Sequence, residues 1–198
     1  MPNNNIIVPG VLVSMIGIIS SLSYNYKIKN TINNLENQAM QDGMTGLLNY
    51  KYFNRRLTEE INRAKRYNNT LTLLFLDLDK FKRINDTHGH QFGDYVIKST
   101  CDIIRKNVRN IDIVSRYGGE EFCVLLINAL KEDCIKTAER IRSEIENFNF
   151  DEGDIKERIT ISIGMSEYPT NAKDLETFIK FADDAMYSAK QSGRNCIR

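Results

Sequence analysis

The chain has 198 residues, 41% of them hydrophobic and 27% charged, so it can form one well-packed domain with a small additional segment. Its 27 Lys and Arg nearly balance 26 Asp and Glu, which excludes the bulk positive field of general nucleic-acid binders, and we expect no nucleic-acid partner. The four cysteines lie far apart and the two histidines stand together in "HGH", so neither set predicts a zinc site and the thiols are expected to be reduced.

Residues 1–26 contain no charged side chain. A helix from Ile6 to Tyr26 would be about 30 Å long, the thickness of a bilayer's hydrocarbon core, so we predict a single membrane anchor in residues 1–26. A cleaved signal peptide and an amphipathic or buried helix are the alternatives. Lys27 and Lys29 follow directly, which favours a plasma (inner) membrane protein whose remaining chain is cytoplasmic.

Residues 27–41 are predicted to form a helical linker. Ile28, Ile32, Leu35 and Ala39 are spaced by four, three and four residues, which is typical of a short coiled-coil seam that would pair two chains. A helix lying on its own domain, or a plain linker, is the alternative.

Clear periodicity runs from Asn49 onward. Asn49 is placed to cap a helix that reaches Tyr67, and the apolar "LTLLFLDLD" from Leu71 predicts a buried central strand. The further predicted elements are a helix after "HGHQFGD", two strands joined through "RYGGEEF", a helix over 132–148, a strand in "RITISIGMSEY", a helix over 174–191 ended by Gly193, and an edge strand in "NCIR".

This order predicts an α/β (α+β) fold with a split βαββαβ core, a mixed or antiparallel sheet of about five strands flanked by helices. In "RITISIGMSEY" the residues Ile159, Ile161 and Ile163 are expected to point inward, with Thr160 and Ser162 pointing outward.

Acidic residues occur at two places that this fold would bring together. Asp77 and Asp79 end the central strand on one face, and Glu120 and Glu121 lie at the tip of the following hairpin. Carboxylates that meet in this way are typical of a Mg²⁺ site. The glycines in "RYGGEEF" would let a bulky phosphorylated ligand lie against the turn. A solvent-exposed hairpin with acids for solubility is the alternative.

Five motifs together resemble the GGDEF family of diguanylate cyclases: "DGMTGLLN", "DLDKFKRINDTHGHQFGD", "RYGGEEF", "ITISIG" and "ADDAMYSAKQSGRN". The resemblance covers residues 42–198. It implies a palm-like domain similar to that of adenylyl cyclases. It also implies an enzyme that condenses two GTP into cyclic di-GMP and two pyrophosphates, with two domains face to face in a homodimer.

The resemblance also implies roles for individual residues. Two Mg²⁺ ions, or Mn²⁺ as an alternative, would be bound by Asp77, the Leu78 carbonyl and Glu120, with Glu121 near the second ion. GTP would be bound by the residues that match the family's phosphate, guanine and turn positions: Lys82, Lys190 and Arg194 for phosphate, Asn85 and Asp94 for guanine, and Gly118 and Gly119 at the turn. Lys82 is included with the carboxylates in the expected catalytic set. The alternative role of Lys82, Lys190 and Arg194 is surface solubility. The alternative role of Asn85 and Asp94 is to cap local turns. His88 and His90 are assigned to loop structure.

A second site is implied by "RNID", where Arg109 and Asp112 match the family's inhibitory product-binding site and Arg140 is a further candidate. The alternative is an ordinary ion pair between residues three apart.

The departures from the family pattern are Met44, the pair Tyr50-Lys51, and Glu120 in place of aspartate; none removes a catalytic ligand. A non-catalytic cyclic di-GMP receptor and a cyclase for mixed dinucleotides remain alternative functions. The intact acids disfavour the first, and Asp94, as a full carboxylate for guanine, disfavours the second.

Overall fold

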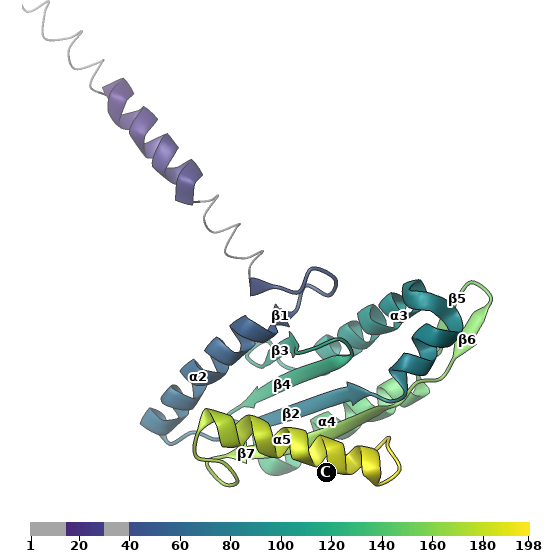
Figure 1. The fold of residues 1–198 in the computed structure, drawn as a ribbon. Helices are drawn as coiled ribbons and strands as arrows, with labels where there is room; N and C mark the ends of the chain where they lie inside the picture. The colour runs from purple at the N-terminus through teal and green to yellow at the C-terminus, as the bar shows by residue number, and fades with distance from the viewer. Residues whose placement is uncertain (1–14, 30–39) are drawn as a thin grey trace, which may run out of the picture. The chain divides into compact units, whose positions relative to one another are not determined.

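A computed structural model describes residues 15–29 and 40–198 (Figure 1). Residues 15–29 are helical. In these two described ranges, no helix is both long enough and apolar enough to cross a membrane. The predicted anchor includes residues 1–14 and the predicted seam includes residues 30–39, which lie outside the described residues, so both stay predictions.

One five-stranded sheet organises the compact unit Gln41–Arg198, in the order β1-β3-β4-β2-β7. Only β1 and β3 are parallel, and the other neighbouring strands are antiparallel. The predicted mixed sheet is therefore confirmed. The strands are β1 (Leu48–Asn49), β2 (Leu71–Leu78), β3 (Ile113–Arg116), β4 (Glu121–Ile127) and β7 (Ile161–Tyr168).

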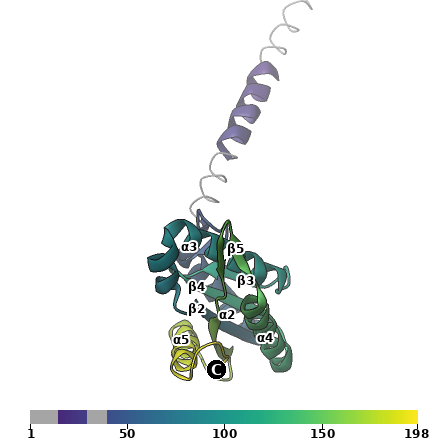
Figure 2. The same cartoon turned by 90° about the vertical axis from the view of Figure 1, so that its right-hand side faces the viewer.

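Four helices cover the two faces of the sheet: α2 (Tyr50–Tyr67), α3 (Phe81–Lys106), α4 (Lys131–Asn147) and α5 (Leu175–Gln191). Because side chains alternate along β2, Leu73 and Phe75 pack with α2 and α5, whereas Leu74 and Leu76 pack with α3 and α4. Figure 2 shows α5 and α4 on opposite sides of the sheet. The predicted cap is confirmed, since the Asn49 side chain accepts from the Tyr52 N–H at 3.0 Å.

The predicted start of the second helix is wrong. Helix α3 already begins at Phe81 and contains "HGHQFGD", with a kink at Gly89, whose φ of 82° and ψ of 166° are not helical. The glycine-rich composition of this stretch is typical of a loop. However, the kink divides α3 into two helical arms, and buried Ile84 before it and buried Phe92 after it hold both arms against the core. His88 and His90 therefore lie in α3 and not in a loop.

The predicted outward face of β7 is also wrong. Ser162 is fully buried because α5 covers the face opposite to Ile161 and Ile163. The predicted final edge strand is present as a short parallel pairing of Ile163 with Ile197. The sequence did not predict a separate two-stranded hairpin formed by β5 (Phe150–Glu152) and β6 (Ile155–Glu157).

Helix α5 approaches β7 closely at Gly164. A Cβ on this residue would overlap the carbonyl oxygen of Ala182 and the backbone nitrogen of Met186, and would lie 2.8 Å from the Met186 Cα. Backbone atoms cannot move aside as a flexible side chain can, so only glycine fits here.

We expect Gly164→Ala to lower the free energy of unfolding by more than about 2 kcal/mol, because α5 must move away from the sheet. Denaturant titration measures this change. Gly43→Ala is the matched control, since no atom lies within 4 Å of its added Cβ, and it should change stability by less than about 1 kcal/mol. Equal effects of the two substitutions would contradict the importance of this contact.

Candidate functional site

Asp77 places a buried carboxylate at the end of the central strand. Every residue of β2 is buried, and Asp77 is only 5% exposed. In the sheet register it lies opposite Glu121 of β4 and Ser162 of β7. Its Oδ2 pairs with Nζ of Lys190, on α5, at 2.7 Å. The structure thus brings together three of the predicted site residues from three different elements.

The tip between β3 and β4 closes over this strand end. The Gly118 N–H donates to the Glu121 carbonyl oxygen at 3.3 Å, and the Leu78 N–H donates to the Glu120 carbonyl oxygen at 3.4 Å. A Cβ on Gly118 would collide with the Glu121 carboxylate, whereas the space beside Gly119 is open. Gly118 therefore makes room for a glutamate of the protein itself, and Gly119 leaves the outside of the turn free.

Arg116 holds the tip in place, a role that the sequence reasoning missed. Its Nη2 and Nε donate to the Gly119 carbonyl oxygen at 2.8 and 3.1 Å. Its Nη1 donates to the Asp42 carboxylate at 3.2 Å. Arg116 and Asp42 both occur in quoted motifs, but 74 residues separate them, and no local pattern predicts that they pair.

Negative charge accumulates at the strand end. Burial raises the pKa of Asp77 to about 6; the hydrogen bond and charge of Lys190 oppose this shift, while Glu120 and Glu121 add to it. Burial also raises the pKa of Glu121, with contributions from Asp183 and Glu120 and opposition from Lys190. Asp183, on α5, is a second residue that the sequence reasoning missed. Because acids outnumber the one lysine, the site attracts cations.

The donors at this site have the chemistry that a hard divalent cation prefers. Carboxylate oxygens and a strand-end carbonyl are typical Mg²⁺ ligands, and buried carboxylates with repelling neighbours are stabilised by a cation. However, within the described ranges no three His, Cys, Asp or Glu side chains form a group that could hold a metal ion. The predicted ligands Asp77, Glu120 and Glu121 share one rim of the sheet, and Asp77 contacts Lys190 there.

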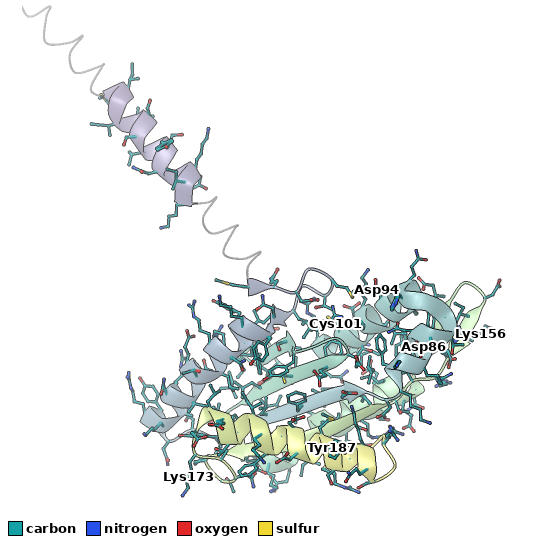
Figure 3. The ribbon with its side chains drawn as sticks, viewed as in Figure 1. Asp86, Asp94, Cys101, Lys156, Lys173 and Tyr187 are labelled. Atoms are coloured by element: carbon teal, nitrogen blue, oxygen red, sulfur yellow. The ribbon has the colours of Figure 1, made fainter. Side chains whose placement is uncertain are left out.

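The predicted guanine residues lie on the two arms of α3. Figure 3 shows Asp86 on the first arm, next to Asn85 in sequence, and Asp94 on the second. A Cβ on Gly93 would overlap Oδ1 of Asn85, so the Asn85 amide touches the backbone directly beside Asp94. Lys82 is exposed in the first turn of α3.

His88 has a structural partner. Its Nε2 lies 2.8 Å from Oε1 of Glu157, and Glu157 also pairs with Arg83 at 3.2 Å. These contacts fasten the β5–β6 hairpin to the first arm of α3.

Arg194 lies after α5 and lines a cavity of about 360 Å³ between the end of β2 and the beginning of β7. Three further cations, Lys80, Arg83 and Arg158, line the same cavity. The arrangement therefore offers positive charge beside the carboxylate rim.

A separate cavity of about 280 Å³ collects Arg109, Asp112 and Arg140. Nη2 of Arg109 pairs with Oδ1 of Asp112 at 2.8 Å, and the Asp112 side chain is only 1% exposed. Arg140 donates to the side chain and the carbonyl of Asn107 at 2.7 and 2.6 Å. The ion pair that was the alternative interpretation is present, but its acid is buried and also accepts from the Ile127 N–H at 3.1 Å.

Comparison with known proteins gives a consistent result. The model of the family described as "Diguanylate cyclase, GGDEF domain" matches residues 39–196. Response regulator PleD from Caulobacter vibrioides is 36% identical over 176 residues, which cover 88% of this chain and 39% of that protein. Diguanylate cyclase A from Treponema denticola is 40% identical over 159 residues, covering 79% of this chain and 43% of that protein. The chain thus spans about two fifths of the length of these relatives.

Two solved structures are similar over most of the chain. The coiled coil and GGDEF domain of DgcB from Caulobacter crescentus, in complex with c-di-GMP, has a TM-score of 0.86 at 28% identity and covers 92% of this chain and 97% of that one. The active GGEEF domain of a diguanylate cyclase from Vibrio cholerae has a TM-score of 0.71 at 32% identity and covers 76% of this chain and 97% of that one. The chain therefore belongs to the GGDEF domain family of diguanylate cyclases.

Proposed function

We propose that this protein is a diguanylate cyclase that condenses two GTP into cyclic di-GMP and two pyrophosphates. The observation that supports this most is the carboxylate rim of Asp77, Glu120 and Glu121 beside Gly119, with Lys190 inside it. Relatives with this fold include the active GGEEF domain from Vibrio cholerae, whose motif this chain shares.

The rim would bind the ions that accompany the triphosphate. Asp77, the Leu78 carbonyl and Glu120 would hold one Mg²⁺, and Glu121 would lie near a second. When bound, Mg²⁺ would neutralise the triphosphate and lower the pKa of the attacking 3′-hydroxyl. Mn²⁺ has the same preference for oxygen ligands and is the alternative.

The chain's own residues would orient the nucleotide. Lys190 would exchange its carboxylate partner for a phosphate oxygen, and Lys82 and Arg194 would add positive charge. The Asp94 carboxylate would accept from the N1–H and N2–H of guanine, and the neighbouring Asn85 amide would meet its O6 or N3. Such positioning and charge stabilisation account for most of the catalysis in phosphoryl transfer.

Two chains would be needed for each product. In each step a 3′-hydroxyl forms a bond to the α-phosphorus of the other GTP, pyrophosphate leaves with its bonding electrons, and the hydroxyl proton passes to solvent. Because each domain would hold one GTP, the two sites must face each other in a homodimer.

We further propose that cyclic di-GMP inhibits the enzyme at the cavity of Arg109, Asp112 and Arg140. The exposed Arg109 guanidinium is oriented by a buried carboxylate, and arginine suits both a phosphate and a guanine edge. A GGDEF domain of the relative DgcB is described in complex with c-di-GMP. A receptor without catalysis would need only this cavity, so the product assay below separates the two functions.

Glu120→Ala should lower cyclic di-GMP formation from GTP and Mg²⁺ by at least about 100-fold, because a carboxylate at the metal rim is lost. Chromatographic measurement of product and pyrophosphate tests this, and forcing dimerisation should raise the wild-type rate. Glu152→Ala, which removes an exposed glutamate on β5, is the control and should keep full activity. A wild-type dimer that binds GTP but forms no product would exclude the enzyme function.

Asp77→Asn should stabilise the metal-free protein while removing activity. The pKa of about 6 in the folded state lies above the ordinary 3.8. The free energy of unfolding of the wild type should therefore fall by up to about 3 kcal/mol as the pH rises from about 4 through 6, because Asp77 then ionises in a buried place. In thermal unfolding with EDTA, the melting temperature of Asp77→Asn should therefore rise relative to that of the wild type as the pH increases over this range.

Added Mg²⁺ with a non-hydrolysable GTP analogue should raise the melting temperature of the wild type more than that of Asp77→Asn. Equal pH profiles for the two proteins in EDTA would contradict the assigned cost of burying Asp77.

Arg109→Ala should weaken cyclic di-GMP binding by at least about tenfold and raise the plateau of product accumulation, because a charged contact is lost. Calorimetric titration measures the affinity. Lys106→Ala, which removes a surface lysine paired with Glu144, is the control. Unchanged affinity in a folded Arg109→Ala protein would exclude the proposed inhibitory role of this cavity.

A further inference from the structure

Asp79 is a buried acid that the proposed chemistry leaves without a role. It follows β2 directly and is only 6% exposed. Its Oδ1 accepts from the Ser162 hydroxyl at 2.7 Å, and its Oδ2 accepts from the Thr160 hydroxyl at 2.7 Å and from the Asn195 backbone N–H at 3.1 Å. One carboxylate therefore joins the end of β2, the start of β7 and the segment after α5.

The segment held by Asp79 has an unfavourable backbone. Gly193, Arg194 and Asn195 have φ angles of 109°, 69° and 48°, and two of these three consecutive residues carry a Cβ. Such residues rarely adopt left-handed angles unless surrounding contacts enforce them, and these conformations concentrate at ligand-binding sites. The turn thus depends on its anchors.

A second anchor comes from α4. Oδ1 of Asn195 accepts from Arg142 at 2.6 Å, and Nδ2 of Asn195 donates to Glu146 at 2.7 Å. Arg142 itself pairs with Glu146 at 2.8 Å. Asn195 is consequently fixed through its backbone by Asp79 and through its side chain by α4.

These contacts leave the neighbouring Arg194 free to bind a ligand. Its backbone N–H closes the helix end on the Ala189 carbonyl at 3.0 Å, but within the described part of the chain no ion pair or side-chain hydrogen bond involves its guanidinium. It lines the cavity that also contains Lys80, Arg83 and Arg158. The acid in this cavity, Asp79, has both oxygens occupied by donors, so the cavity presents mainly positive charge.

We propose that Asp79 is a positioning residue, which enforces the Gly193–Asn195 turn so that Arg194 meets the terminal phosphates of GTP. This inference rests on the proposed function, in which Arg194 contacts phosphate. Asp79 itself would not touch the nucleotide. Loss of Asp79 should therefore reduce the difference in affinity between a guanosine triphosphate and a monophosphate, and should leave guanine recognition intact.

Binding of a non-hydrolysable GTP analogue and of GMP to the full chain, each with Mg²⁺, tests the proposal by calorimetry. Asp79→Ala should weaken binding of the GTP analogue by about tenfold, the expected loss of one charged contact, and change GMP binding by less than about twofold. In steady-state assays the KM for GTP should rise more than kcat falls.

Asp79→Asn provides the conservative rescue. The amide oxygen of the introduced asparagine can accept from Thr160 and from the Asn195 N–H. Its NH₂ group can donate to the Ser162 hydroxyl, which can rotate to accept, so all three contacts can be kept. It should retain binding of the GTP analogue within about threefold of the wild type.

Asp174→Ala is the matched control for helix stability, since Asp174 caps the other end of α5 by accepting from the Thr177 N–H at 2.8 Å. It should lower the melting temperature without changing the ratio of GTP-analogue to GMP affinity. If Asp79→Ala does not fold, Thr160→Val tests the same anchor, because it removes one of the two hydroxyls that orient the Asp79 carboxylate, and it should weaken binding of the GTP analogue more than binding of GMP.

The outcomes separate this inference from the proposed function. A wild type that prefers the GTP analogue in an Asp79-dependent way but makes no product would refute the cyclase and support the positioning role. Parallel losses of GTP-analogue and GMP binding in Asp79→Ala, no loss of either, or no preference for the triphosphate in the wild type would overturn the inference.

Discussion

The burial of an ionisable carboxylate at the end of the central strand is the constraint on which the site depends. Strand β2 is covered on both faces, so Asp77 has lost most of its hydration, and a charge in such a place requires a partner. In the described structure Lys190 is that partner at 2.7 Å. If the proposed cation binds here, its charge would stabilise the ionised Asp77, so relief of the cost of burying this acid would contribute to the affinity for the cation.

Helix α5 carries this partner, so its placement matters as much as the carboxylate itself. Gly164 lets the helix touch the backbone of β7, and Asp174 caps its first turn. At its far end Asp79 holds the turn that follows. The contact at Gly164 and the turn held by Asp79 fix the end of the helix that carries Lys190, so this side chain pairs with Asp77 with little loss of conformational freedom.

Much of this architecture follows from local sequence patterns, because buried strands and capped helices have strong periodic signals. The apolar run from Leu71 and the cap at Asn49 are examples. Patterns failed where tertiary packing decided the outcome. The stretch around Gly89 has the composition of a loop, but it forms only a kink between two helical arms that pack against the core, and Ser162 is polar but covered by α5. The pairing of Arg116 with Asp42 across 74 residues has no local signal at all.

The kink in α3 sets the distance between Asn85 and Asp94. In a straight helix, Asn85 and Asp94 would be nine positions apart, or about 13.5 Å along the axis. The break at Gly89 folds the helix back, so that the Asn85 amide touches the backbone at Gly93, next to Asp94. The spacing between these two side chains is therefore set by the dihedral angles of one residue and not by helical periodicity. The proposed contacts of Asn85 and Asp94 with one guanine therefore depend on the conformation of a single glycine.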